Sequence, residues 1–170
     1  ESITVDPGLE VTLRASVATG EVTARWDDRL GNVDGLPASV HIGPDASLIE
    51  QVAGVDLVVS AGSFFQSGPQ AADLLVDAVS RHAPELASAR AVVDAYGGIG
   101  LFAATAVPSE VDVWVVETSR AALADARINL DGRGGRSEFA QGEFGRWRPV
   151  RGDLRPEVVI ADPARSGLGR

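Results

Sequence analysis

Apolar and polar residues alternate near the amino terminus with the period of a β-strand. In residues 11–17 and again in residues 22–26, every second side chain is apolar and its neighbours are polar, which is typical of a half-buried strand. Thr19-Gly20 lies between the two runs and indicates a turn, so together they predict a β-hairpin. Short runs at 40–42 and 57–60 predict two further strands.

From about residue 67 the chain changes to stretches with a helical period that alternate with short apolar runs. The first helix is expected to have Ser67 as its N-cap and Pro69 in its first turn, and to end before Pro84. Residues 101–107 and 119–130 predict two more helices. The core strands are expected at 91–93, 111–116, 137–140 and 157–161. Because strand–helix–strand units of this kind form parallel sheets, the sequence predicts an α/β fold: a Rossmann-like, mostly parallel sheet preceded by a β-hairpin region.

The change from a strand-like pattern to alternating strands and helices suggests a division of the chain near residue 60. Residues 1–60 are expected to form a β-rich amino-terminal part, and residues 61–170 a Rossmann-like core that is incomplete at its carboxyl end. With 45% hydrophobic and 23% charged residues, the chain has the composition of a folded globular protein. No apolar run approaches the roughly 18 residues of a membrane span, and no signal peptide opens the sequence. We therefore expect a cytoplasmic protein without a membrane partner.

The residue types that are missing exclude several kinds of chemistry. The chain contains no Cys, so it cannot form a disulfide, a thiolate metal site or a Cys nucleophile, and we expect no metal. Its 15 basic residues are all Arg and its net charge is −9, which argues against a basic nucleic-acid groove lying wholly within these residues. Because the sequence opens at Glu1 and lacks Met, we expect a piece of a longer protein.

The strongest chemical signal is the glycine-rich segment at residues 94–100, which lies directly after a predicted strand and directly before a predicted helix. Glycines at such a turn allow the backbone to approach a ligand, and the helix offers unpaired N–H groups. The next strand ends at Glu117, 23 residues after Asp94. An acid about 20 residues after such a loop is where nucleotide sites bind the ribose diol. The pattern therefore predicts a nucleotide-type site at the carboxyl ends of these two strands.

The order of residues in this loop distinguishes between two cofactors. It reads D-x-x-G-G-x-G, led by Asp94, rather than the G-x-G-x-x-G of dinucleotide-binding proteins. S-adenosyl-L-methionine (AdoMet) has no pyrophosphate, so its loop needs an acid near the methionine ammonium more than it needs a phosphate cradle. The loop therefore favours AdoMet, and an NAD-linked oxidoreductase remains an alternative.

Four segments in the same order along the chain carry a family resemblance: F-F-Q at 64–66, D-x-Y-G-G-x-G-L-F at 94–102, V-E-x-S-x-x-A-L-x-D-A-R-x-N at 116–129 and D-P-A-R-x-G-L at 162–168. Together they resemble the RNA (uracil-5-)methyltransferase family, AdoMet-dependent enzymes that methylate C5 of a uridine in tRNA or rRNA. The resemblance implies a class I methyltransferase fold, AdoMet as cofactor, and RNA as a partner of the full-length protein.

The resemblance also implies a cofactor site. Gln66 is expected to contact the methionine part of AdoMet, Tyr96 to line the pocket, and Glu117 to hold the ribose hydroxyls. Asp162 is expected beside both the cofactor and the target base. Glu143 lies where class I methyltransferases often place an acid for the adenine amine, with a solvated loop acid as the alternative. The predicted cofactor residues are Gln66, Asp94, Tyr96, Gly98, Gly100, Glu117, Glu143 and Asp162.

Two further positions are candidates for contact with RNA. Arg165, in the D-P-A-R turn, is expected to bind substrate together with Asp162, because a guanidinium suits bidentate contacts with phosphate. Pairing with a nearby acid is the alternative for Arg165. Trp147 lies between two Arg residues and is the Trp to consider as a stacking contact, with packing as its alternative.

The sequence departs from the family in two ways. The family usually has Cys in the loop at the position of Gly97. Its nucleophilic Cys and its general-base Glu are expected downstream of Arg170, so no catalytic residue is predicted within this chain and the fragment alone is expected to be inactive. An AdoMet-dependent methyltransferase with another substrate, and a cofactor- or RNA-binding module without catalysis, are the remaining alternatives.

Overall fold

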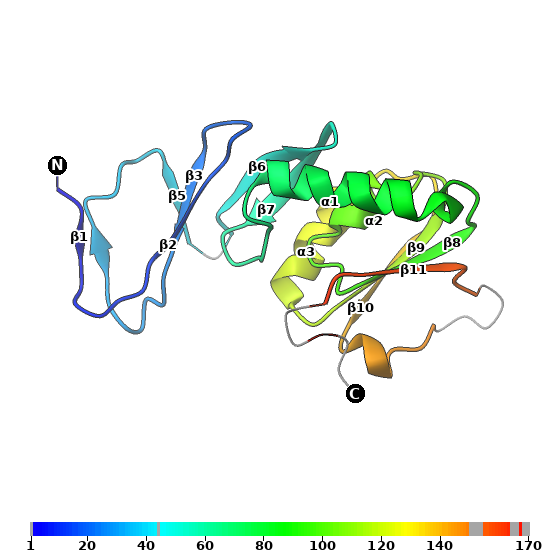
Figure 1. The fold of residues 1–170 in the computed structure, drawn as a ribbon. Coiled ribbons are helices and arrows are strands. Elements are labelled where there is room, and N and C mark those ends of the chain that lie inside the picture. The colour runs from blue at the N-terminus through cyan, green and yellow to red at the C-terminus, as the bar shows by residue number, and fades with distance from the viewer. Residues whose placement is uncertain (1, 44, 150–154, 164–166, 168–170) are drawn as a thin grey trace.

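A four-stranded, all-parallel sheet in the order β10-β9-β8-β11 forms the centre of the protein (Figure 1). The computed structural model describes residues 2–43, 45–149, 155–163 and 167. The strands of this sheet are β8 (Ala91–Ala95), β9 (Asp112–Glu117), β10 (Ser137–Gln141) and β11 (Val158–Ala161). The predicted α/β fold with a mostly parallel sheet is therefore confirmed.

Helices connect and flank these strands: α1 (Pro69–His82), α2 (Leu101–Thr105) and α3 (Arg120–Asn129), with the short 3-10 helices η1 (Pro84–Ala87) and η2 (Phe144–Arg146). Ser119 caps α3, and its hydroxyl accepts a hydrogen bond from the backbone N–H of Ala122. The predicted N-cap of α1 is wrong by one residue. Gly68 takes that position with a φ of 129°, which only glycine adopts readily. No helix in the described part of the chain is long and apolar enough to cross a membrane.

Successive side chains of the sheet point to opposite faces. Val92 of β8 packs with α1 and α2, and Val113 of β9 packs with α3. Val93 and Trp114 point the other way and pack against the segment 144–147. The three α-helices therefore share one face of the sheet, as Figure 1 shows, and an aromatic segment covers the other. The loops that follow the parallel strands all reach one edge of the sheet.

The amino-terminal residues form small sheets from β1 (Thr4–Val5), β2 (Thr12–Ala15), β3 (Val22–Arg25), β4 (Val33–Asp34) and β5 (Val40–Ile42). The predicted hairpin is confirmed, because β2 and β3 pair antiparallel, and β5 joins β3 in parallel. Its predicted apolar face is confirmed in β3, where Ala24 is fully buried, but is wrong in the run at residues 11–17. Leu13 and Val17 are 62% and 66% exposed. Ser16, by contrast, is buried, because its hydroxyl donates to the carbonyl of Ile49 in the neighbouring hairpin (2.6 Å).

A second hairpin, β6 (Ser47–Val52) and β7 (Val55–Ser60), leads into the core. The sequence pattern predicted β7 but not β6. Ala53 and Gly54 form its turn with φ values of 50° and 78°, as in the two-residue turns that suit hairpins. Leu57 and Val59 are fully buried and share a hydrophobic cluster with Val76 of α1. The division of the chain near residue 60 stays a prediction.

Candidate functional site

The carboxyl ends of β8 and β11 lie side by side at the point where the order of the sheet reverses. From β8 the chain runs through β9 and β10 on one side and returns to β11 on the other. In open parallel sheets, ligands bind in the crevice outside the strand ends at such a point. Asp94 lies near the end of β8, Glu117 ends β9, and Asp162 directly follows β11. Three predicted site residues therefore meet at one edge of the sheet.

Asp94 is a buried carboxyl group against the glycine-rich loop, only 1% exposed. Its Oδ2 accepts a hydrogen bond from the backbone N–H of Ala103 in the first turn of α2 (3.0 Å). Its Oδ1 has no hydrogen-bond partner in the described part of the chain. Burial raises the pKa of Asp94 to about 7; the hydrogen bond from Ala103 opposes this rise, and the charges of Asp162 and Glu117 add to it. A carboxyl group with an unused oxygen at this place suits a cationic ligand.

The loop after β8 adopts left-handed backbone conformations at three residues. Tyr96, Gly98 and Gly100 have φ values of 59°, 55° and 79°. At Gly97 a Cβ atom would lie 2.8 Å from Cγ1 of Val115, closer than real contacts allow. The Cys that the family usually has at this position therefore does not fit this backbone without a shift. The loop depends on glycine both for its turns and for its approach to β9.

Glu117 connects this loop to the start of α3. Its Oε2 accepts a hydrogen bond from the backbone N–H of Gly98 (3.1 Å). Its Oε1 accepts hydrogen bonds from the backbone N–H of Ser119 (2.8 Å) and the hydroxyl of Thr118 (3.0 Å). The side chain is half-buried, so its carboxylate is fixed in direction and still reaches the surface of the crevice. A carboxylate held in this way can accept hydrogen bonds from two neighbouring hydroxyls.

Gln66 reaches the crevice from the segment before α1. Its Nε2 donates a 3.2 Å hydrogen bond to Oδ2 of Asp162, which is 96 positions away in the sequence. Phe65 packs against the hydrophobic core, whereas Phe64 is 76% exposed. One aromatic ring thus anchors the segment that presents Gln66, and the structure joins the first and the last of the predicted cofactor residues.

Tyr96 belongs to an aromatic cluster on the face of the sheet opposite the helices. Its ring centroid lies 6.1 Å from that of Phe144, whose ring in turn stacks on Trp147 at 6.3 Å and 22°. Trp147 also contacts Trp114 at 6.2 Å. These contacts favour packing over a free stacking platform for Trp147, and they give the Tyr96 side of the crevice an apolar wall.

Two predicted residues are not brought into the crevice by any described contact. Glu143 precedes η2, and its carboxylate pairs with Arg146 at 3.2 Å, with both side chains mostly exposed. Since the next residue, Phe144, contacts Tyr96, Glu143 lies at the rim of the site, and its role toward adenine stays a prediction. Arg165 lies outside the described residues. No three His, Cys, Asp or Glu side chains in the described ranges are arranged to hold a metal ion.

Two polar residues of α3, to which the sequence analysis assigned no role, hydrogen-bond the segments that carry the site residues. The Asp125 carboxylate is 2% exposed and accepts hydrogen bonds from the turn at residues 60–63. Asn129 bonds both backbone groups of Val58 and donates to the carbonyl of Ile99 in the glycine-rich loop (2.9 Å). Both belong to the third sequence motif. An Asp and an Asn four positions apart on the apolar face of a helix are the signal that could have identified them.

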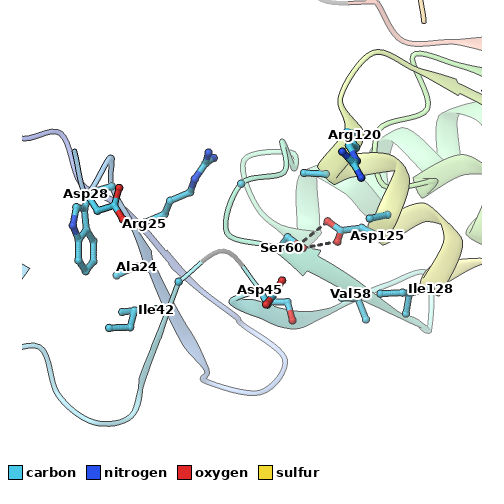
Figure 2. Close-up of a pocket in the computed structure, with 16 residues that line it drawn as sticks. Ala24, Arg25, Asp28, Ile42, Asp45, Val58, Ser60, Arg120, Asp125 and Ile128 are labelled. Carbon is cyan, nitrogen blue, oxygen red and sulfur yellow. Dashed lines mark hydrogen bonds between the residues drawn. The ribbon is translucent and has the colours of Figure 1, made fainter. Parts of the chain in front are cut away.

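A cavity of about 1070 Å³ lies elsewhere, between the β3–β5 sheet and the paired β7 and α3 (Figure 2). Arg25 and Asp28 line it from the amino-terminal part, and Arg120 and Asp125 line it from α3. None of the predicted cofactor residues is among the described residues that line it. The candidate site is therefore the crevice at the strand ends, where those residues converge, and not this cavity.

Comparison with solved structures identifies the fold. The chain resembles the tRNA (uracil-54, C5)-methyltransferase of Pyrococcus abyssi, solved in complex with S-adenosyl-L-homocysteine, with a TM-score of 0.68 and 24% identity. The match covers 95% of this chain and 45% of that protein. The parallel sheet, with its glycine-rich loop at the switch point, is a class I methyltransferase fold.

Comparison with curated proteins then gives relatives of the chain. An RNA methyltransferase of Lactiplantibacillus plantarum is 30% identical over 169 residues, covering 91% of this chain and 36% of that protein. An RNA methyltransferase of Streptomyces coelicolor is 34% identical over 185 residues, covering 96% and 40%. No model of a known protein family matches the chain. The chain is therefore related to RNA methyltransferases over nearly its whole length, and it spans less than half the length of these curated relatives.

Proposed function

We propose that the crevice at the carboxyl ends of β8, β9 and β11 binds AdoMet. The observation that carries this proposal is the convergence of Gln66, Asp94, Glu117 and Asp162, from four separate segments, around the glycine-rich loop. Glu117 suits the ribose diol, whereas Asp94 and the Gln66–Asp162 pair suit the cationic methionine end. The S-adenosyl-L-homocysteine in the Pyrococcus abyssi structure supports this assignment.

We also propose that the full-length protein transfers the methyl group to C5 of a uridine in tRNA or rRNA. The support is the set of four ordered motifs and the RNA methyltransferase relatives. Uracil C5 is a weak nucleophile until a thiolate adds to C6, and the C5 proton must then be removed by a base. The chain contains no Cys, so the thiolate must come from a part of the full-length protein outside these 170 residues, and the family resemblance implies that the base Glu lies there too.

Within this division, the residues of this chain bind and orient rather than react. Glu117 holds the ribose. Gln66 holds the methionine end of AdoMet beside Asp162. Asp162 lies at the mouth of the crevice, where the target base approaches the methyl group, and Arg165 contacts the RNA. AdoMet supplies the methyl group when bound. The 170-residue chain alone is therefore inactive in methyl transfer.

Titration calorimetry with AdoMet and with NAD tests the cofactor assignment on the chain itself. We expect one AdoMet site per chain and no heat from NAD, because the loop lacks the dinucleotide pattern. Binding of NAD in preference to AdoMet, or binding of neither, would contradict the proposal. Binding of AdoMet followed by methylation of a substrate other than RNA would point to the alternative of another methyltransferase.

Release of tritium from RNA that carries [5-³H]uridine tests the reaction, because only substitution at C5 transfers that label to water. The full-length protein with AdoMet is expected to release it from tRNA or from rRNA, and the 170-residue chain is expected to release none. A full-length protein that binds AdoMet and RNA but releases no label would indicate a module without catalysis. Release by the short chain would overturn the predicted division of labour.

A further inference from the structure

The buried carboxylate of Asp125 on α3 accepts three hydrogen bonds from one turn of the chain, at residues 60–63. Asp125 accepts hydrogen bonds from the backbone N–H of Ser60 (2.9 Å), the hydroxyl of Ser60 (2.5 Å) and the hydroxyl of Ser63 (2.6 Å). Figure 2 draws the two bonds from Ser60. Donors and acceptor are more than 60 residues apart in sequence. Because a buried carboxylate is costly unless its hydrogen bonds are satisfied, Asp125 fixes the position of this turn.

The same turn is held from its other side by Arg14 of β2. The guanidinium donates to the carbonyl of Ser63 (2.8 Å) and to that of Ser60 (3.4 Å). Burial lowers the pKa of Arg14, and the nearby charges of Glu50 and Asp125 oppose that change. The backbone N–H of Ser63 also donates to the carbonyl of Ser60 (3.0 Å). The turn is therefore clamped between α3 and the amino-terminal hairpin.

Only two residues separate this turn from Gln66. Phe65 packs into the core between them, and the backbone carbonyl of Gln66 accepts a hydrogen bond from the N–H of Gly68 at the start of α1 (2.6 Å). The connection is thus short and anchored, so a displacement of Ser63 is transmitted to Gln66. The Gln66 side chain would then no longer lie within hydrogen-bond distance of Asp162.

We propose that Asp125 is a positioning residue for the cofactor site: by holding the turn at residues 60–63 it sets the reach of Gln66 toward Asp162. This inference rests on the proposed binding of AdoMet. It gives a function to a residue that lies outside the crevice and that touches the cofactor only through Gln66.

The test is a double-mutant cycle on AdoMet affinity, measured by calorimetry at a temperature where every variant is folded by circular dichroism. We expect Asp125→Ala to weaken AdoMet binding roughly tenfold and Gln66→Ala to weaken it about as much. In the Gln66→Ala background, the further effect of Asp125→Ala should fall to about twofold or less, because the residue acts through Gln66. The loss of melting temperature caused by Asp125→Ala should be the same in both backgrounds.

Conservative and control variants sharpen the result. Asp125→Asn should bind AdoMet within about threefold of the unaltered chain, because its amide oxygen accepts and its amide NH₂ donates to a serine hydroxyl. Asp131→Ala, in the exposed turn that follows α3, should leave the affinity unchanged. If Asp125→Ala does not fold, Ser63→Ala replaces it, with a loss of about threefold that Gln66→Ala should abolish.

Two outcomes overturn the inference. The first is an affinity loss that is fully additive with Gln66→Ala. The second is a loss of melting temperature with unchanged AdoMet affinity, which would make Asp125 a residue for stability alone. Failure of the unaltered chain to bind AdoMet would instead contradict the proposed function itself, so the two failures are distinguishable.

Discussion

The side-chain amide of Gln66 donates a 3.2 Å hydrogen bond to the carboxylate of Asp162, across 96 positions of sequence. Gln66 belongs to the first of the four motifs and Asp162 to the last. The charge of Asp162 also contributes to the raised pKa of the buried carboxyl group of Asp94. Two segments with no local relationship in the sequence thus form one wall of the proposed AdoMet site.

Replacement of the Gln66 side chain should weaken AdoMet binding more than it lowers the stability of the fold. Gln66 is only partly buried, so we expect Gln66→Ala to weaken AdoMet binding roughly tenfold, the effect of losing one or two hydrogen bonds to a charged group. The melting temperature should change little. Gln70→Ala, on the exposed side of α1, is the matched control and should bind normally. Equal affinities for the two variants would remove Gln66 from the site.

Glu117 is expected to contribute more, because it holds both a ligand and the loop. We expect Glu117→Ala to reduce AdoMet affinity by at least about tenfold, since two hydroxyl bonds to a charged acceptor are lost together with the bond from Gly98. Calorimetry against Glu110→Ala, an exposed acid before β9, measures the difference. A loss confined to stability would show that Glu117 serves the loop and not the ribose.

The core of the fold could be read from the sequence because its pattern is strict. The strands β8 and β9 are buried along nearly their whole length, so continuous apolar runs marked them. In the amino-terminal part the same reasoning failed. β6 contains Glu50, which is 2% exposed, and this buried acid breaks the apolar period. Its carboxylate faces the backbone N–H of Val17, a non-local contact that no spacing rule reveals.

The site was foreseeable in part for the same reason. The glycine-rich loop and Glu117 follow directly from strand ends that a pattern can locate. The places of Gln66 and Asp162 beside the cofactor were implied only by the family resemblance. Neither their contact with each other nor the bonds from Asp125 to the turn at residues 60–63 were foreseen. Both depend on how α3 and the second hairpin pack, and hydrogen bonds over such separations have no local signature.

Substitution of Gly97 tests whether the backbone of this loop differs from the one that accepts the family's usual Cys. We expect Gly97→Cys to lower the free energy of unfolding by about 1–3 kcal/mol, because its Cβ would meet Cγ1 of Val115 at 2.8 Å. Urea unfolding measures the change. Gly145→Ala is the control, since a Cβ there meets nothing within 4 Å. An unchanged stability for Gly97→Cys would show that the loop shifts freely to accept the family's usual residue.

The raised pKa of Asp94 predicts how the stability of the protein changes with pH. Its pKa is about 7 in the folded chain because of burial, against an ordinary value of 3.8. Between these two values the folded state keeps a proton that the unfolded state has lost, so this group makes the protein less stable as the pH rises toward 7. Above about pH 7 both states are ionised and the contribution stays constant at its least favourable level.

Asp94→Asn removes this titration while its amide oxygen can still accept the hydrogen bond from Ala103. We therefore expect the stability of the variant relative to the unaltered chain to improve by roughly 3 kcal/mol from about pH 5 to about pH 8, at about 1.4 kcal/mol for each unit crossed. Urea unfolding at several pH values measures the difference, in which titrations common to both proteins cancel. A difference that is flat with pH, or that falls as the pH rises, would mean that Asp94 is ionised throughout and that the crevice carries its full negative charge before any cation binds.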